Sequence, residues 1–291
     1  MKSHTICLAQ TAPVLGDLVY NKEKHLECCR WAIQQGAGTI VFPELALTGY
    51  HTAEQTPDLA LRVDDPFWNE LKDISRKITI ITGCVLEERG PFFYNAAVVL
   101  SGGDIRFVHR KVYLPTYRIF EEGKWFARGQ VWRTFDNHGY RSGILICEES
   151  WHLLPAYVLF LRGVDVLFIL TNSPQNTPRL EDPNSPACAC RNQNEFFARM
   201  LQTFVIFMNR AGEEKGRHYW GGSEALAPDG QRLCRAGRDE ERLLVHLDPA
   251  VLREQRIRTP LRRDEDVLLA FHNIQWLMHK EPSNKIEGER T

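Results

Sequence analysis

Apolar residues follow two different periods along the chain, and segments of the two kinds alternate. Short apolar runs predict strands, and they occur at residues 5–10, 39–42, 79–87, 92–100, 105–110, 131–136, 140–147, 164–170, 205–208 and 243–247. Apolar residues three or four positions apart predict amphipathic helices, at residues 21–36, 66–77, 150–162, 192–202 and 264–278. Strands alternating with helices, with hairpin turns between several strands, predict an α/β fold with two mixed sheets and helices outside them.

One buried run ends on a cysteine. Residues 143–146 read Gly-Ile-Leu-Ile, and Cys147 follows at once, before Glu148 and Glu149 and a helical pattern. This order predicts a strand-to-helix turn, where rigid elements can hold a side chain at the edge of a sheet. A core cysteine is the alternative, because free Cys is among the most buried residue types.

Charged residues follow two other predicted strands. Glu44 comes just after the strand at 39–42. Lys111 comes at the end of the strand at 105–110, directly after His109 and Arg110. A solvated loop acid and a surface basic run are the alternatives, but the apolar residues 112–115 follow Lys111 directly. Ligands of open α/β sheets bind outside the carboxyl ends of the strands. We therefore expect a thiol, a carboxylate and an ammonium in one site.

These three groups suit nucleophilic catalysis. A thiol needs a base or a positive neighbour before it becomes a useful nucleophile. His152 lies only five residues after Cys147, without an oriented third partner, and the papain signature is absent, so a carboxylate base is favoured. An ammonium beside a tetrahedral intermediate would stabilise its oxyanion by about 3 kcal/mol if it behaves like one oxyanion-hole donor.

Composition narrows the function classes. The chain is 43% apolar and 25% charged with a net charge of −1, which predicts a globular protein without nucleic-acid or membrane partners. No signal peptide or membrane span is predicted, so we expect a cytoplasmic protein. Its eight cysteines are then expected as free thiols. The sequence has no CxxC or HExxH motif, and neither a metal nor another cofactor is expected.

Three segments resemble the catalytic motifs of the nitrilase, or carbon–nitrogen hydrolase, superfamily, in the same order. They are residues 42–44, 109–115 and 146–149, and the resemblance runs from about Thr5 to about Leu277. It implies a four-layer α-β-β-α sandwich. It also implies that Glu44 is the general base, Lys111 the oxyanion stabiliser and Cys147 the nucleophile. Glu122 matches a further catalytic glutamate of many members, with Glu121 as the alternative.

Within the superfamily, residues 111–129 and 259–265 are similar to the glutaminase domain of glutamine-dependent NAD synthetases. That resemblance implies that Tyr50, Tyr117, Ser173 and Arg179 hold the head of the substrate. An arginine suits a carboxylate because its guanidinium can bind both oxygens, although a solvent arginine is the alternative. We also predict that Trp151, four residues after Cys147, contacts the substrate.

We expect one carbon–nitrogen hydrolase domain over residues 1–280, followed by a polar tail at 281–291. The predicted function is a cysteine amidohydrolase that cleaves a small, carboxylate-bearing amide to acid and ammonia through a thioester. The chain ends where a synthetase domain would begin, so no ATP chemistry is expected. The alternatives are a nitrilase, an N-carbamoyl amino acid hydrolase, an ammonia-supplying glutaminase subunit of a separate synthetase, or a non-hydrolytic interaction protein.

Self-association is also expected. The predicted helix after Cys147 carries more apolar side chains than one sheet can cover. They are Leu153, Leu154, Tyr157, Val158 and Phe160. Family members commonly associate through this helix and the C-terminal segment, so the resemblance implies a homodimer or a larger assembly.

Overall fold

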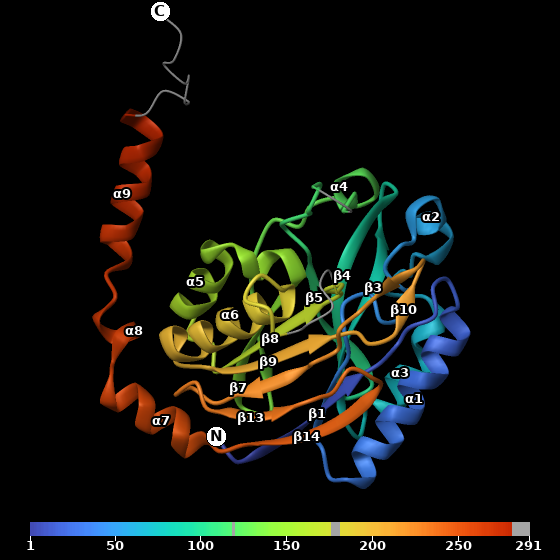
Figure 1. The fold of residues 1–291 in the computed structure, drawn as a ribbon, viewed down its shortest axis with the longest axis horizontal. Coiled ribbons are helices and arrows are strands. Elements are labelled where there is room, and N and C mark those ends of the chain that lie inside the picture. The colour runs from blue at the N-terminus through green and yellow to red at the C-terminus, as the bar shows by residue number, and fades with distance from the viewer. Residues whose placement is uncertain (118–119, 176–180, 281–291) are drawn as a thin grey trace, which may run out of the picture.

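The computed structural model describes residues 1–117, 120–175 and 181–280. Two six-stranded sheets lie in the middle of the molecule with helices on both outer sides (Figure 1). The predicted four-layer α-β-β-α sandwich is therefore confirmed.

The first sheet has the strand order β14-β1-β2-β3-β4-β5. Its strands are β1 (His4–Gln10), β2 (Thr39–Val41), β3 (Thr79–Glu88), β4 (Phe92–Ser101), β5 (Asp104–Arg110) and β14 (Glu241–Leu247). On its outer face lie α1 (Leu18–Gln34) and α3 (Asn69–Ile74), the latter preceded by a 3-10 turn at Pro66–Trp68. The connection from β2 to β3 contains a 3-10 turn at Ala53–Gln55 and the short helix α2 (Thr56–Leu59).

The second sheet has the order β13-β12-β9-β8-β7-β6. Its strands are β6 (Thr134–Asn137), β7 (Tyr140–Ile146), β8 (Val166–Thr171), β9 (Phe204–Asn209), β12 (Glu224–Leu226) and β13 (Arg232–Arg235). It is covered by α5 (Leu153–Leu161) and α6 (Pro186–Leu201), and the 3-10 helix η3 (Cys147–Trp151) joins β7 to α5. A separate small hairpin is formed by β10 (Glu213–Glu214) and β11 (Arg217–His218).

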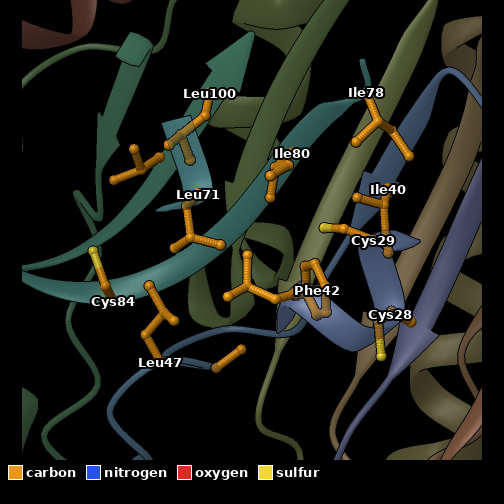
Figure 2. Packing of buried hydrophobic residues seen from close by; sticks show 14 of the residues in the cluster. Cys28, Cys29, Ile40, Phe42, Leu47, Leu71, Ile78, Ile80, Cys84 and Leu100 are labelled. Carbon is orange, nitrogen blue, oxygen red and sulfur yellow. The ribbon is translucent and has the colours of Figure 1, made fainter. Parts of the chain in front are cut away.

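The alternation of side chains along each strand explains why both faces of both sheets are apolar. In β1, Cys7 and Ala9 belong to the core under α1, whereas Ile6 and Leu8 belong to the core between the two sheets. Figure 2 shows part of this outer core, in which Cys28 and Cys29 of α1 and Leu71 of α3 belong to one cluster with the strand residue Ile80.

The second sheet alternates in the same way. Phe168 and Leu170 of β8 face the inter-sheet core, which also contains Ile144 and Met208. Leu167 and Ile169 face the core under α5 and α6. Each sheet is thus buried on both sides, which fixes the register of its strands and the positions of the strand ends.

The C-terminal segment forms α7 (Pro249–Arg258), α8 (Leu261–Asp264) and α9 (Val267–Lys280). Helix α9 extends away from the body of the molecule (Figure 1), and its Phe271 and Trp276 side chains are exposed. On α5, Leu153 and Leu154 are also exposed and line a groove with apolar residues of α6. The described chain contains no helix that is both long and apolar enough to span a membrane. The predicted homodimer or larger assembly stays a prediction.

The structure corrects the predicted boundary of one helix. The sequence pattern began this helix at residue 192, but α6 begins at Pro186. The Ser185 hydroxyl caps it by accepting a hydrogen bond from the Cys188 backbone N–H at 3.0 Å. Proline is favoured in the first turn because its missing N–H has no partner there anyway. A one-turn helix that the pattern did not predict, α4 (Glu122–Trp125), carries Glu122.

Gly83 fixes how closely β3 approaches the chain segment that follows β2. A Cβ at this position would lie 2.2 Å from the backbone nitrogen of Leu45 and 2.9 Å from the Cα of Glu44. We predict that Gly83→Ala lowers the free energy of unfolding by about 1–3 kcal/mol, because the backbone must move to relieve the overlap. Urea unfolding followed by circular dichroism measures this change.

Gly237→Ala is the matched control. Its added methyl group would meet only a Glu241 side-chain oxygen at 3.6 Å, so a change within about 0.5 kcal/mol is expected. Equal destabilisation of the two variants would contradict the proposed close approach at Gly83.

Candidate active site

The carboxyl ends of the strands bring the predicted site residues to one edge of the sandwich. β2 and β3 are parallel, and β5 has the same direction because it is antiparallel to β4, which is antiparallel to β3. Glu44 follows β2 and Lys111 follows β5. In the other sheet β7 and β8 are parallel, with Cys147 and Ser173 after their ends.

Cys147 is the first residue of η3 and has a φ of 44°. A non-glycine residue in this left-handed region is strained, and such strain is typical of functional sites. The Ser150 hydroxyl donates to the Cys147 carbonyl at 2.8 Å and thereby closes the turn. Strand β7 and this turn together hold Cys147 in place.

Lys111 lies between two carboxylates. Its Nζ donates to Glu44 Oε1 and to Glu122 Oε1, each at 2.7 Å, and all three side chains are buried. Because an ammonium has three N–H groups, one remains for another acceptor. Of the two candidate glutamates in this loop, Glu122 and not Glu121 contacts the lysine.

Glu44 is held on one carboxylate oxygen and on its backbone. Asn95 donates to Glu44 Oε1 at 2.8 Å, and Asn172, just after β8, donates to the Glu44 carbonyl at 2.8 Å. This last contact ties the two sheets together beside the site. Oε2 of Glu44 is buried and has no hydrogen-bond partner in the described part of the chain. It can therefore accept a proton from a neighbouring group.

Burial and the neighbouring charges set the ionisation of the cluster. Burial opposes the charge on Lys111, but Glu122 and Glu44 outweigh it and raise the pKa of the ammonium. Burial also raises the pKa of Glu122, against the opposing effect of Lys111. The pKa of the Cys147 thiol lies well above its ordinary value because of burial and, next, the charge of Glu44. A thiol whose pKa is raised in this way needs a neighbouring base to become a nucleophile.

Glu149 supports this cluster, and the sequence did not single it out. Its carboxylate accepts hydrogen bonds from His109 Nε2 at 2.7 Å and from the backbone N–H of Ile146 and of Val112 at 2.7 and 2.9 Å. Trp132 Nε1 donates to it at 2.9 Å. One buried anion therefore ties the end of β7, before Cys147, to the segment after Lys111.

Tyr50 lies beside the charged cluster, and its predicted contact with the substrate stays a prediction. Its hydroxyl donates to Glu122 Oε1 at 2.6 Å, and it is not among the residues that line the cavity beside Cys147. The Glu214 carboxylate holds the Tyr50 backbone N–H at 3.1 Å and the His51 backbone N–H at 2.8 Å. Tyr50 thus positions a glutamate.

A cavity of about 760 Å³ opens beside Cys147. The predicted substrate-binding residues Tyr117, Trp151 and Ser173 line it. Arg179 lies outside the described residues. The cavity has other polar lining residues that the sequence did not indicate, among them Glu148, Asn184, Arg217 and His218. The last two belong to the β10–β11 hairpin, whose strands are too short for a periodic signal.

The described residues contain no cluster of three or more His, Cys, Asp or Glu side chains that could hold a metal ion. The structure contains no disulfide among the cysteines, and all eight are free. Near Cys147, the Lys111 ammonium is instead paired with the Glu44 and Glu122 carboxylates. The site is therefore built from charged side chains at strand ends.

Comparison with known proteins places this geometry in a family. Residues 5–257 match the carbon-nitrogen hydrolase family, and the chain belongs to it. It is accordingly an enzyme that acts on carbon–nitrogen bonds. The predicted membership is confirmed.

Two individual relatives show which kinds of family member this chain is similar to. The chain is 28% identical over 245 residues to a glutamine-dependent NAD(+) synthetase of Acinetobacter baylyi, covering 84% of this chain and 44% of the synthetase. It thus spans less than half the length of that relative, and the predicted resemblance to the glutaminase part is confirmed. It is also 31% identical to an (R)-stereoselective amidase of a Pseudomonas species, over 90% of this chain and 89% of the amidase.

Solved structures share the fold. A carbon-nitrogen hydrolase of Helicobacter pylori superposes with a TM-score of 0.82 at 21% identity, covering 94% of this chain and 98% of the other. At this identity the likeness concerns the architecture, the two-sheet sandwich described above.

We predict that Glu149→Gln lowers the free energy of unfolding by about 3 kcal/mol at neutral pH, because an amide nitrogen would face donors in a buried site. The pKa of Glu149 is lowered from 4.5, where burial is outweighed by His109 and the backbone donors. Its stabilisation is therefore fully present above about pH 4.5 and is lost as the pH falls through the folded-state pKa. Urea titrations from pH 7 to pH 3.5 measure this.

The difference between wild type and Glu149→Gln should thus shrink in acid. A difference that does not change with pH would contradict the role of the charge. Glu148→Gln removes the adjacent carboxylate, whose oxygen accepts from the Tyr117 hydroxyl at the exposed cavity rim, and should change stability by less than about 1 kcal/mol.

Tyr50→Phe removes the hydroxyl that orients Glu122. We predict that kcat falls about tenfold while KM changes less than about twofold, because the lost hydrogen bond does not involve the substrate. Steady-state kinetics on any amide that is turned over measure both constants. Tyr117→Phe alters the cavity lining and serves as the comparison. A raised KM with unchanged kcat in Tyr50→Phe would instead support direct substrate binding.

Proposed function

We propose that this chain is a cysteine amidohydrolase that cleaves a small, carboxylate-bearing amide to the acid and ammonia. The observation that carries the proposal is the thiol of Cys147 in the cavity wall, beside a buried Glu44 with one unpartnered oxygen. A protonated nucleophile, a base with a free lone pair and a buried ammonium are the groups that acyl transfer requires.

In the first half of the reaction, Glu44 Oε2 takes the thiol proton while Cys147 Sγ attacks the amide carbon. The resulting tetrahedral intermediate carries its negative charge on the former carbonyl oxygen. Glu44 then returns the proton to the amide nitrogen, the C–N bond breaks, and ammonia leaves. A thioester between Cys147 and the acyl group remains.

In the second half, water replaces ammonia. Glu44 removes a proton from the water as its oxygen attacks the thioester carbon. The C–S bond breaks, the sulfur recovers its proton from Glu44, and the carboxylic acid leaves. Every proton that Glu44 accepts is returned, so no external acid, base or cofactor is consumed.

Lys111 suits the role of oxyanion stabiliser in both halves. Its pairing with Glu44 and Glu122 leaves one N–H, which can donate to the developing oxyanion. Glu122 and Tyr50 fix the direction of this group before the substrate arrives. Such preorganisation supports catalysis because no charge has to be reoriented during the reaction.

The relatives support an amide substrate. The amidase match extends along nearly the whole length of both chains. The similarity to a synthetase that depends on glutamine favours an amide that also carries a carboxylate. It equally supports a second candidate, in which this chain releases ammonia from glutamine for a separate synthetase. A nitrilase of Pyrococcus abyssi is 27% identical, so a nitrile belongs among the test substrates.

The test is ammonia release from four compounds by the purified chain without partners. They are glutamine, a neutral aliphatic amide, an aliphatic nitrile and an N-carbamoyl amino acid. We predict the highest kcat/KM for glutamine or another carboxylate-bearing amide. Cys147→Ala should abolish turnover, with less than a few per cent of the activity left, because the attacking atom is missing.

Cys234→Ala is the matched control, since it also removes a partly buried free thiol but lies away from the cavity lining. It should keep its activity. Clear residual turnover in Cys147→Ala would refute the nucleophile assignment. Preferred turnover of the nitrile or the carbamoyl compound would refute the amide class, and glutamine turnover only with an added synthetase would favour the second candidate.

A further inference from the structure

We propose that Arg217 of β11 binds the carboxylate of the substrate. This assignment rests on the proposed function, because it presumes an amide substrate whose acyl part carries a carboxylate. It concerns a residue that the sequence did not indicate, and it gives the β10–β11 hairpin a role as a wall of the substrate site.

The hairpin lies directly beside the end of β8. Pro174 forms a β-bridge with Tyr219, and the Gln175 backbone N–H donates to the His218 carbonyl at 2.8 Å. Arg217 and Ser173 line the same cavity as Cys147. Strand β11 thus lies alongside the segment that follows β8. Its Arg217 places a guanidinium in the wall of the cavity that the thiol of Cys147 also lines.

The base of the hairpin is fixed by a buried ion pair. Arg210 Nη1 donates to Glu214 Oε2 at 2.6 Å, and both side chains are almost completely buried. The Glu214 carboxylate also accepts from the backbone N–H groups of Tyr50 and His51, and its pKa is lowered to about 2 because His51 and Arg210 outweigh burial. Arg217 pairs with Glu214 in the hairpin register. The hairpin is therefore tied to the segment that orients Glu122.

The charges around the cavity favour an anion at Arg217. Within the described part of the chain, no carboxylate forms an ion pair with Arg217. Glu148, the carboxylate in the cavity lining, accepts from Tyr117 at 2.7 Å and lies 3.5 Å from His152. A guanidinium without a partner anion is unfavourable in a partly desolvated cavity. A guanidinium can bind both oxygens of a carboxylate through two parallel N–H groups.

The neighbouring His218 is the weaker candidate. Its imidazole side chain is 73% exposed and lies 3.4 Å from Glu213 Oε2. A group that is mostly in solvent and already beside an acid contributes little to recognition. Arg217 is therefore the residue of the hairpin with the charge and the position to select a carboxylate.

The experiment compares three substrates with the same amide group. They are glutamine, the monoamide of a five-carbon dicarboxylic acid, and the neutral amide of a five-carbon fatty acid. We expect Arg217→Ala to reduce kcat/KM about ten- to hundredfold for the two carboxylate-bearing amides, through KM, and less than about twofold for the neutral amide. Arg217→Lys should lie between, because it keeps the charge but loses the two-pronged geometry.

Lys215→Ala is the matched control. Lys215 belongs to the same hairpin and carries the same charge, but its Nζ donates to the His51 carbonyl at 3.2 Å and it is not among the cavity-lining residues. This variant should treat the three substrates as wild type does. Retained turnover of the neutral amide by Arg217→Ala would show that the variant is folded.

The outcomes separate this inference from the proposed function. Equal losses on all three substrates, or the same pattern in Lys215→Ala, would overturn the role of Arg217 while leaving the amidohydrolase intact. If wild type prefers the neutral amide, both the carboxylate-bearing substrate class and the role of Arg217 are overturned. Loss of discrimination in Arg217→Ala alone would support the inference.

Discussion

The ammonium of Lys111 is buried, and that constraint organises the rest of the site. A charge removed from water is stable only when opposite charges and hydrogen bonds replace its hydration. Glu44 Oε1 and Glu122 Oε1 each lie 2.7 Å from its Nζ. The same two oxygens also accept hydrogen bonds, from Asn95 to Glu44 and from the Tyr50 hydroxyl to Glu122. The segment after β2, the first part of β4 and the segment after β5 must therefore lie close enough for these side chains to form hydrogen bonds with one another.

Two groups of this network keep a hydrogen-bonding position that the network itself does not fill. Lys111 has one N–H beyond its two ion pairs, and Glu44 has one oxygen without a partner in the described chain. Both would be expensive defects in an ordinary core, where buried polar groups are paired. In the proposed mechanism they have a chemical use next to the strained Cys147, because one receives a proton and the other donates to an oxyanion. The surrounding sheets keep them in place.

Much of this site could be predicted from the sequence because it depends on strand direction. Glu44, Lys111 and Cys147 each follow an apolar run, and parallel strands bring their ends to one edge. The position of Tyr50 could not be predicted in the same way, since its contact with Glu122 joins two loops far apart in sequence. The start of α6 was missed because Ser185-Pro186, a helix-capping pair, also fits a loop.

The position of the hairpin at residues 213–218 depends on a buried charge, and no periodic sequence pattern predicts it. Its strands have two residues each, so no alternation can reveal them. What determines its place is Glu214, whose carboxylate holds Arg210 and the backbone of Tyr50 and His51. Tyr50 in turn holds Glu122. The cavity wall that carries Arg217 and the Tyr50 segment that contacts Glu122 are thus fixed by the same buried anion, Glu214. A substrate group bound to that wall would be positioned relative to the reacting atoms by interior contacts, which move far less than a free surface loop.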